Sequence, residues 1–297
     1  MLLEKLIQEA TQRTNKVVAV AAAEDHEVVE AVKMALEQDI ASFQLFGDES
    51  KTAAMLQELN LKTSDKLEII PCTSPEDAAK KAVQSVSSGH ADVLMKGMVP
   101  TARILKEVLN KEYGLRKGKV LSHVAAFEIS GYDRFVFITD AAMNIAPDLQ
   151  QKADIILNAV NIAASIGIKE PKVAPIAAVE VVNPAMEATL DAAALTQMNR
   201  RGQIKGCVVD GPLALDNAVS IEAAAHKGIK GEVAGVADIL LVPNIETGNA
   251  LYKSLIYFAR ARVGAVIAGA KAPIVLTSRA DSAESKLYSI ALAVSSA

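Results

Sequence analysis

The sequence predicts an α/β protein, and three observations support this prediction. Short β-branched runs alternate with longer amphipathic stretches rich in Ala, Glu and Lys. Some runs, such as Ile239-Leu240-Leu241-Val242, are apolar at every position, which indicates strands of a parallel sheet with helices on both faces. An aromatic content of 4% without Trp argues against a β-sandwich and against a surface that stacks nucleic-acid bases.

Strands are expected where β-branched and apolar residues run together and end at turn-forming residues. They are Lys16–Ala21, Ser42–Phe46, Leu67–Pro71, Asp92–Met95, Phe135–Thr139, Lys172–Ala177, Gly206–Asp210, Asp238–Val242 and Pro273–Thr277.

Helices are expected where apolar residues recur every three or four positions. They are Asp25–Asp39, Glu49–Leu59, Ser74–Ser87, Thr101–Lys111, Pro147–Ile168, Met186–Asn199, Ile245–Ala261 and Asp281–Ala293. The segment Ser74-Pro75-Glu76-Asp77 is typical of a helix N-terminus. Ser can cap the helix, Pro suits the first helical position, and the acidic side chains interact favourably with the positive end of the helix dipole.

Composition narrows the class of protein. The 297 residues are enough for two domains. With 31 basic and 35 acidic residues the net charge is −4, so we expect neither nucleic acid nor an anionic membrane as a partner. The uncharged stretch 155–168 has 14 residues, fewer than the ~20 of a membrane span. The amphipathic start, Met1 to Arg13, does not resemble a secretory signal, so we expect a cytoplasmic protein.

Cysteine and histidine give no sign of a metal site. Cys72 and Cys207 lie far apart without a CxxC partner, so neither a disulfide framework nor a zinc site is expected. The histidines show no ligand spacing, and of them His123, in an apolar segment, is the one worth mutating. The sequence contains no G-x-G-x-x-G and no P-loop, which disfavours a dinucleotide-fingerprint oxidoreductase and a P-loop NTPase.

Polar or Gly-containing segments follow five of the expected strands. In an open parallel sheet, ligands bind beyond the carboxyl ends of the strands. Each segment alone could be turn or cap chemistry, but five together indicate a shared cleft. The segments are Lys96-Gly97-Met98, Thr139-Asp140-Ala141-Ala142-Met143-Asn144, 210–216, 243–249 and Ser278-Arg279-Ala280-Asp281-Ser282.

These segments, in this order and spacing, resemble the phosphate acetyl/butyryltransferase family. The resemblance rests on Asp140-Ala141-Ala142, on Asp210-Gly211-Pro212-Leu213, on Pro243-Asn244-Ile245-Glu246-Thr247-Gly248-Asn249 and on Ser278-Arg279. It runs from about Lys16 to the C-terminus. The length near 300 and Ser278-Arg279-Ala280-Asp281-Ser282 look like the butyryl branch, since the acetyl branch carries Ser-Arg-Gly and is somewhat longer.

The resemblance implies the fold of isocitrate and isopropylmalate dehydrogenases, with mainly parallel sheets in αβα layers and an inter-domain cleft. It implies that the C-terminal segment returns to the first domain. Domain I is expected at residues 1–127 plus 272–297, and domain II at 128–271. A homo-oligomer is also implied.

The implied reaction is butanoyl-CoA plus phosphate giving butanoyl phosphate plus CoA, without a metal and without a cofactor other than CoA as substrate. Arg279 is expected to bind phosphate, because its planar fork makes two charge-assisted bonds. Ser278 is expected to donate to the acyl oxygen or the thiolate, although it could instead cap the last helix. Lys96, followed by Gly97, is a second candidate cation unless it is solvated surface, and Thr101 a second hydroxyl.

The proton acceptor departs from the family pattern. The acetyl branch has an Asp seven residues after the motif Ser, but this sequence has Ser285 there. Glu284 and, less favourably, Asp281 are the alternatives, and phosphate itself could accept the proton.

The remaining candidates are expected to shape the cleft or bind CoA. Asp140, Asn144, Asp210 and Asn244 are expected mainly to hold loops, and Gly211 and Gly248 to permit close backbone approach. Pro212, Glu246 and Asn249 belong to the segments that line the cleft. The candidates for the CoA phosphates are Lys253, Arg260 and Arg262.

Three alternatives stay open. The first is the same chemistry on acetyl-CoA, since a pocket discriminates one methylene by only ~1–3 kcal/mol. The second is an NAD- and metal-dependent decarboxylating dehydrogenase of the same fold, which needs clustered aspartates that Asp140, Asp210 and Asp216 do not convincingly provide. The third is a CoA-binding module without catalysis.

Overall fold

The computed structural model describes residues 2–13, 15–118, 120–278 and 281–297, which form two compact units. Unit 1 comprises Leu3–Gly118 and Gly264–Ala297, and unit 2 comprises Lys119–Val263. The expected boundaries, 127/128 and 271/272, lie several residues later. They differ because β5 (Ser122–Glu128) pairs with β6 of unit 2, whereas β10 (Arg262–Ala268) pairs with β11 of unit 1.

Unit 1 contains strands in the order β3-β2-β1-β4-β11-β10. Neighbouring strands are parallel, except that β10 is antiparallel to β11. Because the C-terminal β11 pairs with β4, the end of the chain completes the sheet that the first residues begin. Besides β10, the bounds are β1 (Val17–Ala21), β2 (Ser42–Gly47), β3 (Leu67–Pro71), β4 (Val93–Lys96) and β11 (Ile274–Val275).

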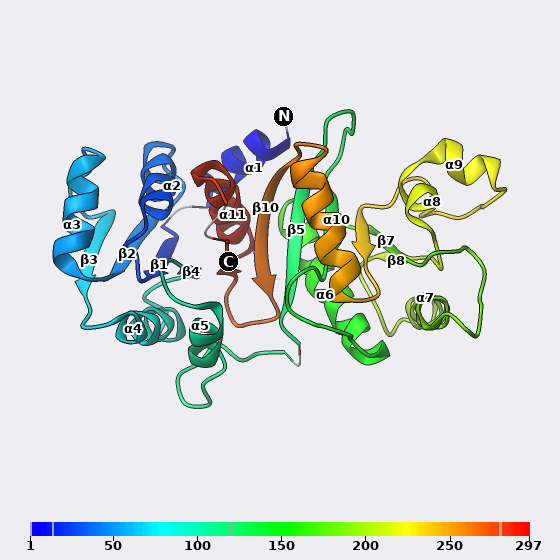
Figure 1. The fold of residues 1–297 in the computed structure, drawn as a ribbon, viewed down its shortest axis with the longest axis horizontal. Coiled ribbons are helices and arrows are strands. Elements are labelled where there is room, and N and C mark those ends of the chain that lie inside the picture. Colours follow the sequence, from blue (N-terminus) through cyan, green and yellow to red (C-terminus); the bar gives the residue numbers. More distant parts are fainter. Residues whose placement is uncertain (1, 14, 119, 279–280) are drawn as a thin grey trace. The chain divides into compact units, whose positions relative to one another are not determined.

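Helices cover both faces of this sheet, as Figure 1 shows. The helices α4 (Pro75–Ser87) and α5 (Thr101–Val108) lie on one face, and α2 (His26–Glu37), α3 (Glu49–Glu58) and α11 (Ala283–Ser296) lie on the other. The first helix is α1 (Leu2–Ala10). Helix α11 packs against α2 and is buried along most of its length, so it is a core helix of unit 1.

Unit 2 contains strands in the order β5-β6-β9-β7-β8. All neighbours are parallel except the antiparallel pair β5–β6. Besides β5, the bounds are β6 (Val136–Thr139), β7 (Lys172–Pro175), β8 (Val208–Val209) and β9 (Ile239–Leu241).

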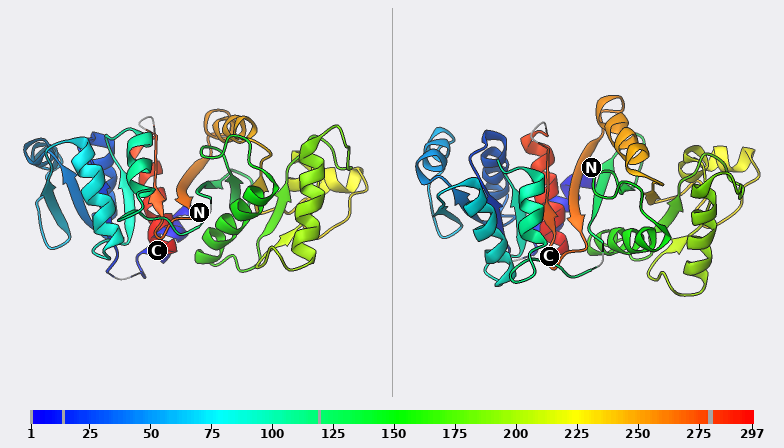
Figure 2. Two further views of the ribbon diagram at one scale, coloured as in Figure 1. Left: turned by 90° about the horizontal axis from the view of Figure 1, so that it is seen from below. Right: turned by 60° about the horizontal axis from the view of Figure 1, so that its bottom comes forward.

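Helices α6 (Leu149–Ser165) and α10 (Ile245–Tyr257) lie on opposite faces of this sheet (Figure 2). Helix α7 (Glu187–Arg200) packs beside α6, and the short helices α8 (Leu215–Val219) and α9 (Ile221–His226) pack on each other. Among the described residues, no helix combines the length and the hydropathy needed to cross a membrane.

The predicted fold class is confirmed, and each expected strand and helix overlaps an observed one. Two strands, β5 and β10, lie outside the predicted set. In their sequences, SHVAAFE and RVGAVIA, Ala or Gly interrupts the β-branched residues, so they lack the continuous run that predicts the other strands. Three helices were also outside the predicted set: α1, whose segment was described only as amphipathic, and α8 and α9, which have only 5 and 6 residues.

Candidate active site

In unit 1 the carboxyl ends of β4 and β11 lie side by side. Val275 pairs with Met95 in parallel register, so Lys96 and the residues that follow Val275 emerge at the same edge of the sheet. The end of β1 lies on the other side of β4, with Ala21 opposite Lys96. The structure therefore places the Lys96 and Ser278 segments at one edge, as expected for a ligand site in a parallel sheet.

Lys96 is buried at this edge. Its side chain is 6% exposed and Nζ donates to the carbonyl of Gly97 at 3.0 Å. The alternative that Lys96 is a solvated surface lysine is therefore wrong. Gly97 follows it in close contact with the neighbouring strand end, because a Cβ at this position would lie 2.0 Å from the Ala22 oxygen. Only glycine fits there without moving backbone.

Ser278 belongs to a tight turn that precedes α11. Its N–H donates to Asp281 Oδ2 at 2.7 Å, and its carbonyl accepts from Asp281 N–H at 3.2 Å. The ammonium of Lys286 donates to the carbonyls of both Ser278 and Asp281. The serine side chain itself is exposed. Arg279, the expected phosphate ligand, lies outside the described residues.

The cap of α11 is Ser282. Its hydroxyl accepts the Ser285 N–H at 3.2 Å, which is the bond that defines an N-cap. The alternative that Ser278 is the N-cap of this helix is therefore wrong.

Two carboxylates considered as proton acceptors have different surroundings. Asp281 is engaged in the turn through Oδ2. Glu284 is exposed in the first turn of α11, and its Oε1 accepts from the Tyr288 hydroxyl at 2.7 Å. Thr101 begins α5 and is exposed, after a Pro100 that offers no side-chain cap.

In unit 2 the end of β6 is organised by Asp140. This carboxylate is 2% exposed and accepts the N–H groups of Ala142, Met143 and Asn144 at 2.9, 3.0 and 3.1 Å. It also accepts from Asn144 Nδ2 at 2.6 Å, and the same amide donates to the Leu121 carbonyl at 2.8 Å. Both oxygens of Asp140 are thus occupied by protein donors that fold the loop.

Helix α10 begins shortly after the end of the adjacent strand β9. Asn244 caps this helix by accepting the Thr247 N–H at 3.0 Å. Gly248 lies against the loop that follows β6, since a Cβ at this position would lie 2.7 Å from the backbone carbonyl oxygen of Asp140. Asn249 donates to the Ala141 carbonyl at 3.5 Å, and Glu246 is exposed. The segments of Asp140 and Asn244 therefore meet.

Asp210 lies elsewhere in unit 2. Its strand β8 is separated from β6 by β7 and β9. Burial raises the pKa of its carboxyl, while the nearby Arg200 acts in the opposite direction. Gly211 approaches Pro175 closely, and a cis peptide bond joins it to Pro212. Asp210 is thus not brought together with Asp140 and Asn244.

The three basic residues expected to bind the CoA phosphates differ in exposure and in pairing. Lys253 is exposed on α10. Arg262 forms an ion pair with Glu128 within unit 2, so its charge is already balanced. Arg260 is exposed just after α10, at a φ of 52°.

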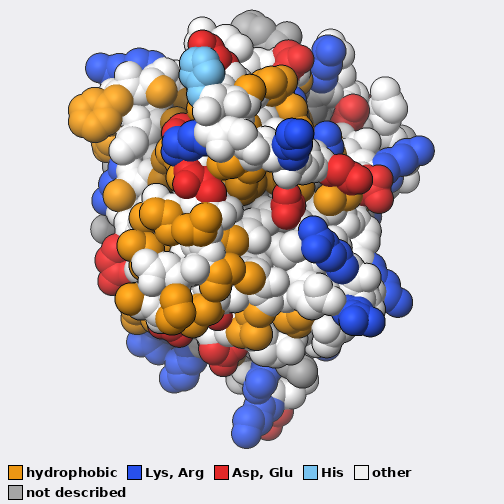
Figure 3. Space-filling model, turned by 90° about the vertical axis from the view of Figure 1, so that its right-hand side faces the viewer, with side chains coloured by type: hydrophobic (Ala, Val, Ile, Leu, Met, Phe, Trp, Pro, Cys, Tyr) orange, Lys and Arg blue, Asp and Glu red, His pale blue; other side chains and the backbone are white. Residues whose placement is uncertain are grey.

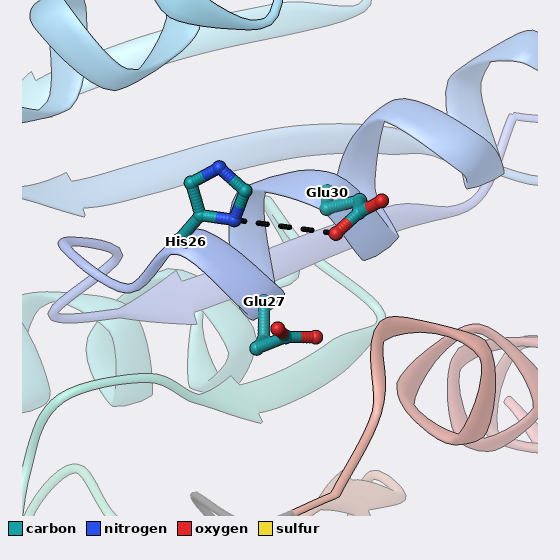
Figure 4. Close-up of side chains that lie close together, drawn as sticks. All are labelled: His26, Glu27 and Glu30. Carbon is teal, nitrogen blue, oxygen red and sulfur yellow. Dashed lines mark ion pairs between the residues drawn. The ribbon is translucent and has the colours of Figure 1, made fainter.

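Among the described residues, Asp140, Asp210 and Asp216 do not gather as a dehydrogenase metal site requires. Asp140 is saturated by amides, and Asp216 pairs with Lys227 at 3.1 Å. Among the described residues, the one group within reach of a common ion is His26, Glu27 and Glu30 of α2, shown in Figure 4. His26 is exposed and lies 4.0 Å from Glu30, and Glu27 accepts the N–H of Ala283.

Two features next to Ser278 were missed from the sequence. Lys286 is 1% exposed although it lies in an amphipathic pattern typical of a surface lysine. Thr277 is 7% exposed, and its Oγ1 has no hydrogen-bond partner among the described residues. The apolar residues around them, Leu287 to Val294, were the available signal that α11 is a core helix.

Comparisons with known proteins identify the family of the chain. The family model "Phosphate acetyl/butaryl transferase" matches residues 1–81 and 73–294. A "Probable phosphate butyryltransferase" of Bacillus subtilis is 60% identical, over 99% of this chain and 97% of that protein. The phosphate butyryltransferase of Clostridium beijerinckii is 53% identical, over 98% and 96%. A branched-chain phosphotransacylase from Enterococcus faecalis matches in structure with a TM-score of 0.84 and 38% identity, covering 95% and 98% of the two chains. The chain therefore belongs to the phosphate acetyl/butyryl transferase family.

Proposed function

We propose that this protein is a phosphate butyryltransferase, which transfers a short acyl group reversibly between CoA and inorganic phosphate. The observation that carries the proposal is that relatives with this name match nearly the whole chain at 53–60% identity. The buried Lys96 and the serine-bearing turn at one sheet edge support it, because the reaction needs hydrogen-bond donors and positive charge for phosphate and for an oxyanion.

In the forward direction, a phosphate oxygen attacks the thioester carbonyl, the C–S bond breaks and the CoA thiolate leaves and takes up a proton. We assign phosphate binding to Arg279 and Lys96, with Gly97 and Thr101 beside them. Ser278 donates to the developing oxyanion or to the thiolate. In the reverse direction a base removes the thiol proton, and Glu284 is assigned to this step because it is exposed in the first turn of α11, whereas Asp281 is half-buried and accepts the Ser278 N–H.

In unit 2 we propose that Lys253 binds a CoA phosphate. Glu246 and Asn249 contact substrate from the first turns of α10, and Pro212 does so from the segment that follows β8. The positions of these segments are set by Asp140, Asn144, Asn244, Gly248, Asp210 and Gly211.

A thiol-release assay tests the function. Acyl-CoA substrates of two to six carbons are mixed with the protein, with and without phosphate, and free thiol is measured. Phosphate-dependent release that is fastest at four or five carbons is the expected result. A maximum at two carbons indicates the acetyl member of the same family, phosphate-independent release indicates thioester hydrolysis, and CoA binding without release indicates a non-catalytic module.

Two further properties belong to this proposal. We propose a cytoplasmic location, because the described cysteines, Cys72 and Cys207, are both free thiols, as is typical of a reducing compartment. Fractionation of the source cells tests this location.

We also propose a homo-oligomer. Figure 3 shows hydrophobic side chains gathered on the face of unit 2 that carries α7–α9, and exposed apolar patches of this kind mark interaction sites. The exposed side chains of this region are Val181, Val182, Met186, Leu190, Leu215 and Ile221. Light scattering should give more than one chain mass for the protein and a single chain mass for the Val181→Lys, Leu190→Lys variant. A single chain mass for the unaltered protein contradicts the proposal.

A further inference from the structure

The buried Tyr288 donates a hydrogen bond to the exposed Glu284, which lies one turn earlier on α11. Tyr288 is 4% exposed, and its hydroxyl oxygen lies 2.7 Å from Glu284 Oε1. A buried tyrosine usually finds a partner for its hydroxyl, and here the partner is a carboxylate at the surface. The bond therefore ties a surface carboxylate to a ring in the core of unit 1.

The backbone around Tyr288 is held against β10. A Cβ at Gly264 of β10 would lie 2.8 Å from the Tyr288 carbonyl oxygen and 3.2 Å from its Cβ, so the helix and the strand approach closely here. The hydroxyl of the next residue, Ser289, accepts the Ala265 N–H at 3.0 Å and donates to the Ser285 carbonyl at 2.8 Å. Close packing on β10 leaves the Tyr288 ring little freedom, so its hydroxyl is a fixed donor.

The first turn of α11, which carries Glu284, is also held from outside the helix. The Ser282 hydroxyl accepts the Ser285 N–H at 3.2 Å, and Glu27 of α2 accepts the Ala283 N–H at 2.9 Å. These two N–H groups have no partner within the helix itself. The backbone at Glu284 is thus fixed, and the direction of its side chain is what the Tyr288 hydroxyl sets.

The direction of this side chain matters for proton transfer. A general base acts only within hydrogen-bond reach of the proton that it takes. An exposed glutamate otherwise samples several rotamers, and most of them point away from any one substrate atom. Enzymes commonly orient the base through a third group, and Tyr288 has the contacts of such a group.

We propose that Tyr288 is the positioning residue of the proton acceptor: its hydroxyl holds the Glu284 carboxylate in the orientation in which it takes the thiol proton of CoA. The inference rests on the proposed function. In the reverse reaction the S–H bond breaks and Glu284 takes the proton, the sulfur forms a bond to the acyl carbon, and the C–O bond to phosphate breaks. The departing phosphate then receives the proton.

A second tyrosine–glutamate pair of unit 1 provides a matched control. Tyr113 donates to Glu107 Oε2 of α5, and both residues are half-buried. Neither residue has been assigned a role with substrate. Tyr113→Phe and Tyr288→Phe delete the same kind of bond, so both variants should show a similar, small decrease in Tm. A purely structural role of Tyr288 predicts no further difference between them.

The reverse reaction, with butanoyl phosphate and CoA, is followed as loss of free thiol. Tyr288→Phe should lower kcat about tenfold, which is part of the ~10²–10⁴ that a general base contributes, and should change KM for CoA less than about twofold. Tyr113→Phe should leave kcat and KM unchanged. An unchanged kcat in Tyr288→Phe overturns the inference.

A double-mutant cycle shows whether Tyr288 acts through Glu284. In the Glu284→Gln background, which already lacks the base, adding Tyr288→Phe should change kcat less than about twofold. The same fold-loss in both backgrounds overturns the inference, because Tyr288 would then act independently of Glu284. A normal kcat in Glu284→Gln overturns it as well, because Glu284 would then not be the base.

If Tyr288→Phe does not fold, Glu284→Asp tests the same contact from the exposed side. The shorter side chain keeps the carboxylate but withdraws it from the Tyr288 hydroxyl, so a similar loss of kcat is expected, and an unchanged kcat overturns the inference. Absence of phosphate-dependent thiol release in the unaltered protein rejects the proposed function instead.

Discussion

Replacing Ser278 and Ser282 with alanine, one at a time, separates chemistry from helix capping at the start of α11. Ser282 accepts the Ser285 N–H at 3.2 Å from an exposed position, so its removal should cost about 1 kcal/mol and lower Tm by about 2–4 °C. The backbone bonds of Ser278 survive its own substitution, so stability should change by less than about 0.5 kcal/mol. Loss of a transition-state donor should nevertheless lower kcat by about 10²–10³.

The thiol-release assay at saturating butanoyl-CoA and phosphate gives kcat, and thermal unfolding followed by circular dichroism gives Tm. We expect Ser278→Ala to keep the Tm of the unaltered protein and to have a much lower kcat. We expect Ser282→Ala to have a lower Tm and a kcat close to that of the unaltered protein. Equal losses of kcat in both variants would refute the reasoning, because they would show that the shape of the turn, and not the Ser278 hydroxyl, limits turnover. A Ser278→Ala variant with normal kcat would remove this residue from the mechanism.

Three other substitutions or probes give direct outcomes. Gly97→Ala places a Cβ 2.0 Å from the Ala22 oxygen and should destabilise the protein by about 1–3 kcal/mol, read as a lower urea midpoint; an unchanged midpoint contradicts the close approach. Burial raises the pKa of Asp210, so the folded state holds its proton more tightly than the unfolded state and stability is lost as pH rises through that raised pKa. Asp210→Asn should therefore raise Tm at pH 8, with a gain that vanishes below the ordinary pKa of 3.8, and a gain that is independent of pH would contradict the assignment. Burial raises the pKa of Cys207 to about 11, so this thiol should stay unmodified by a thiol reagent at pH 8 while the protein is folded, as mass spectrometry of the labelled peptides would show. Rapid labelling of Cys207 would contradict its burial.

The parts of the fold that follow from local pattern could be predicted. Strands such as Leu67–Pro71 and Ile239–Leu241 carry β-branched or apolar runs that end in turn residues, and their helices carry caps. Strands β5 and β10 could not be predicted in the same way, because their β character comes from antiparallel pairing with a neighbour and not from composition.

The candidate site, like the fold, could be predicted only in part. The motif residues could be found because they follow strand ends, but their individual roles depend on partners that sequence does not display. The cap of α11 is Ser282, whereas Ser278, which was considered as an alternative cap, lies four residues earlier and bonds Asp281 through its backbone. The burial of Lys96 and Lys286 depends on what packs around them, so the sequence left a solvated surface position open for Lys96 and gave no signal for Lys286.

Unit 1 is assembled from the two ends of the chain, and this has a consequence for protein synthesis. Strand β11 lies between β4 and β10, and α11 packs on α2, yet both are synthesised after the whole of unit 2. Unit 2 precedes both segments in the sequence, so it can fold during translation. The sheet of unit 1 stays incomplete until β11 is available to pair with β4. A chain that ends before Ile274 would lack β11 and α11, so the sheet of unit 1 would stay open beside β4.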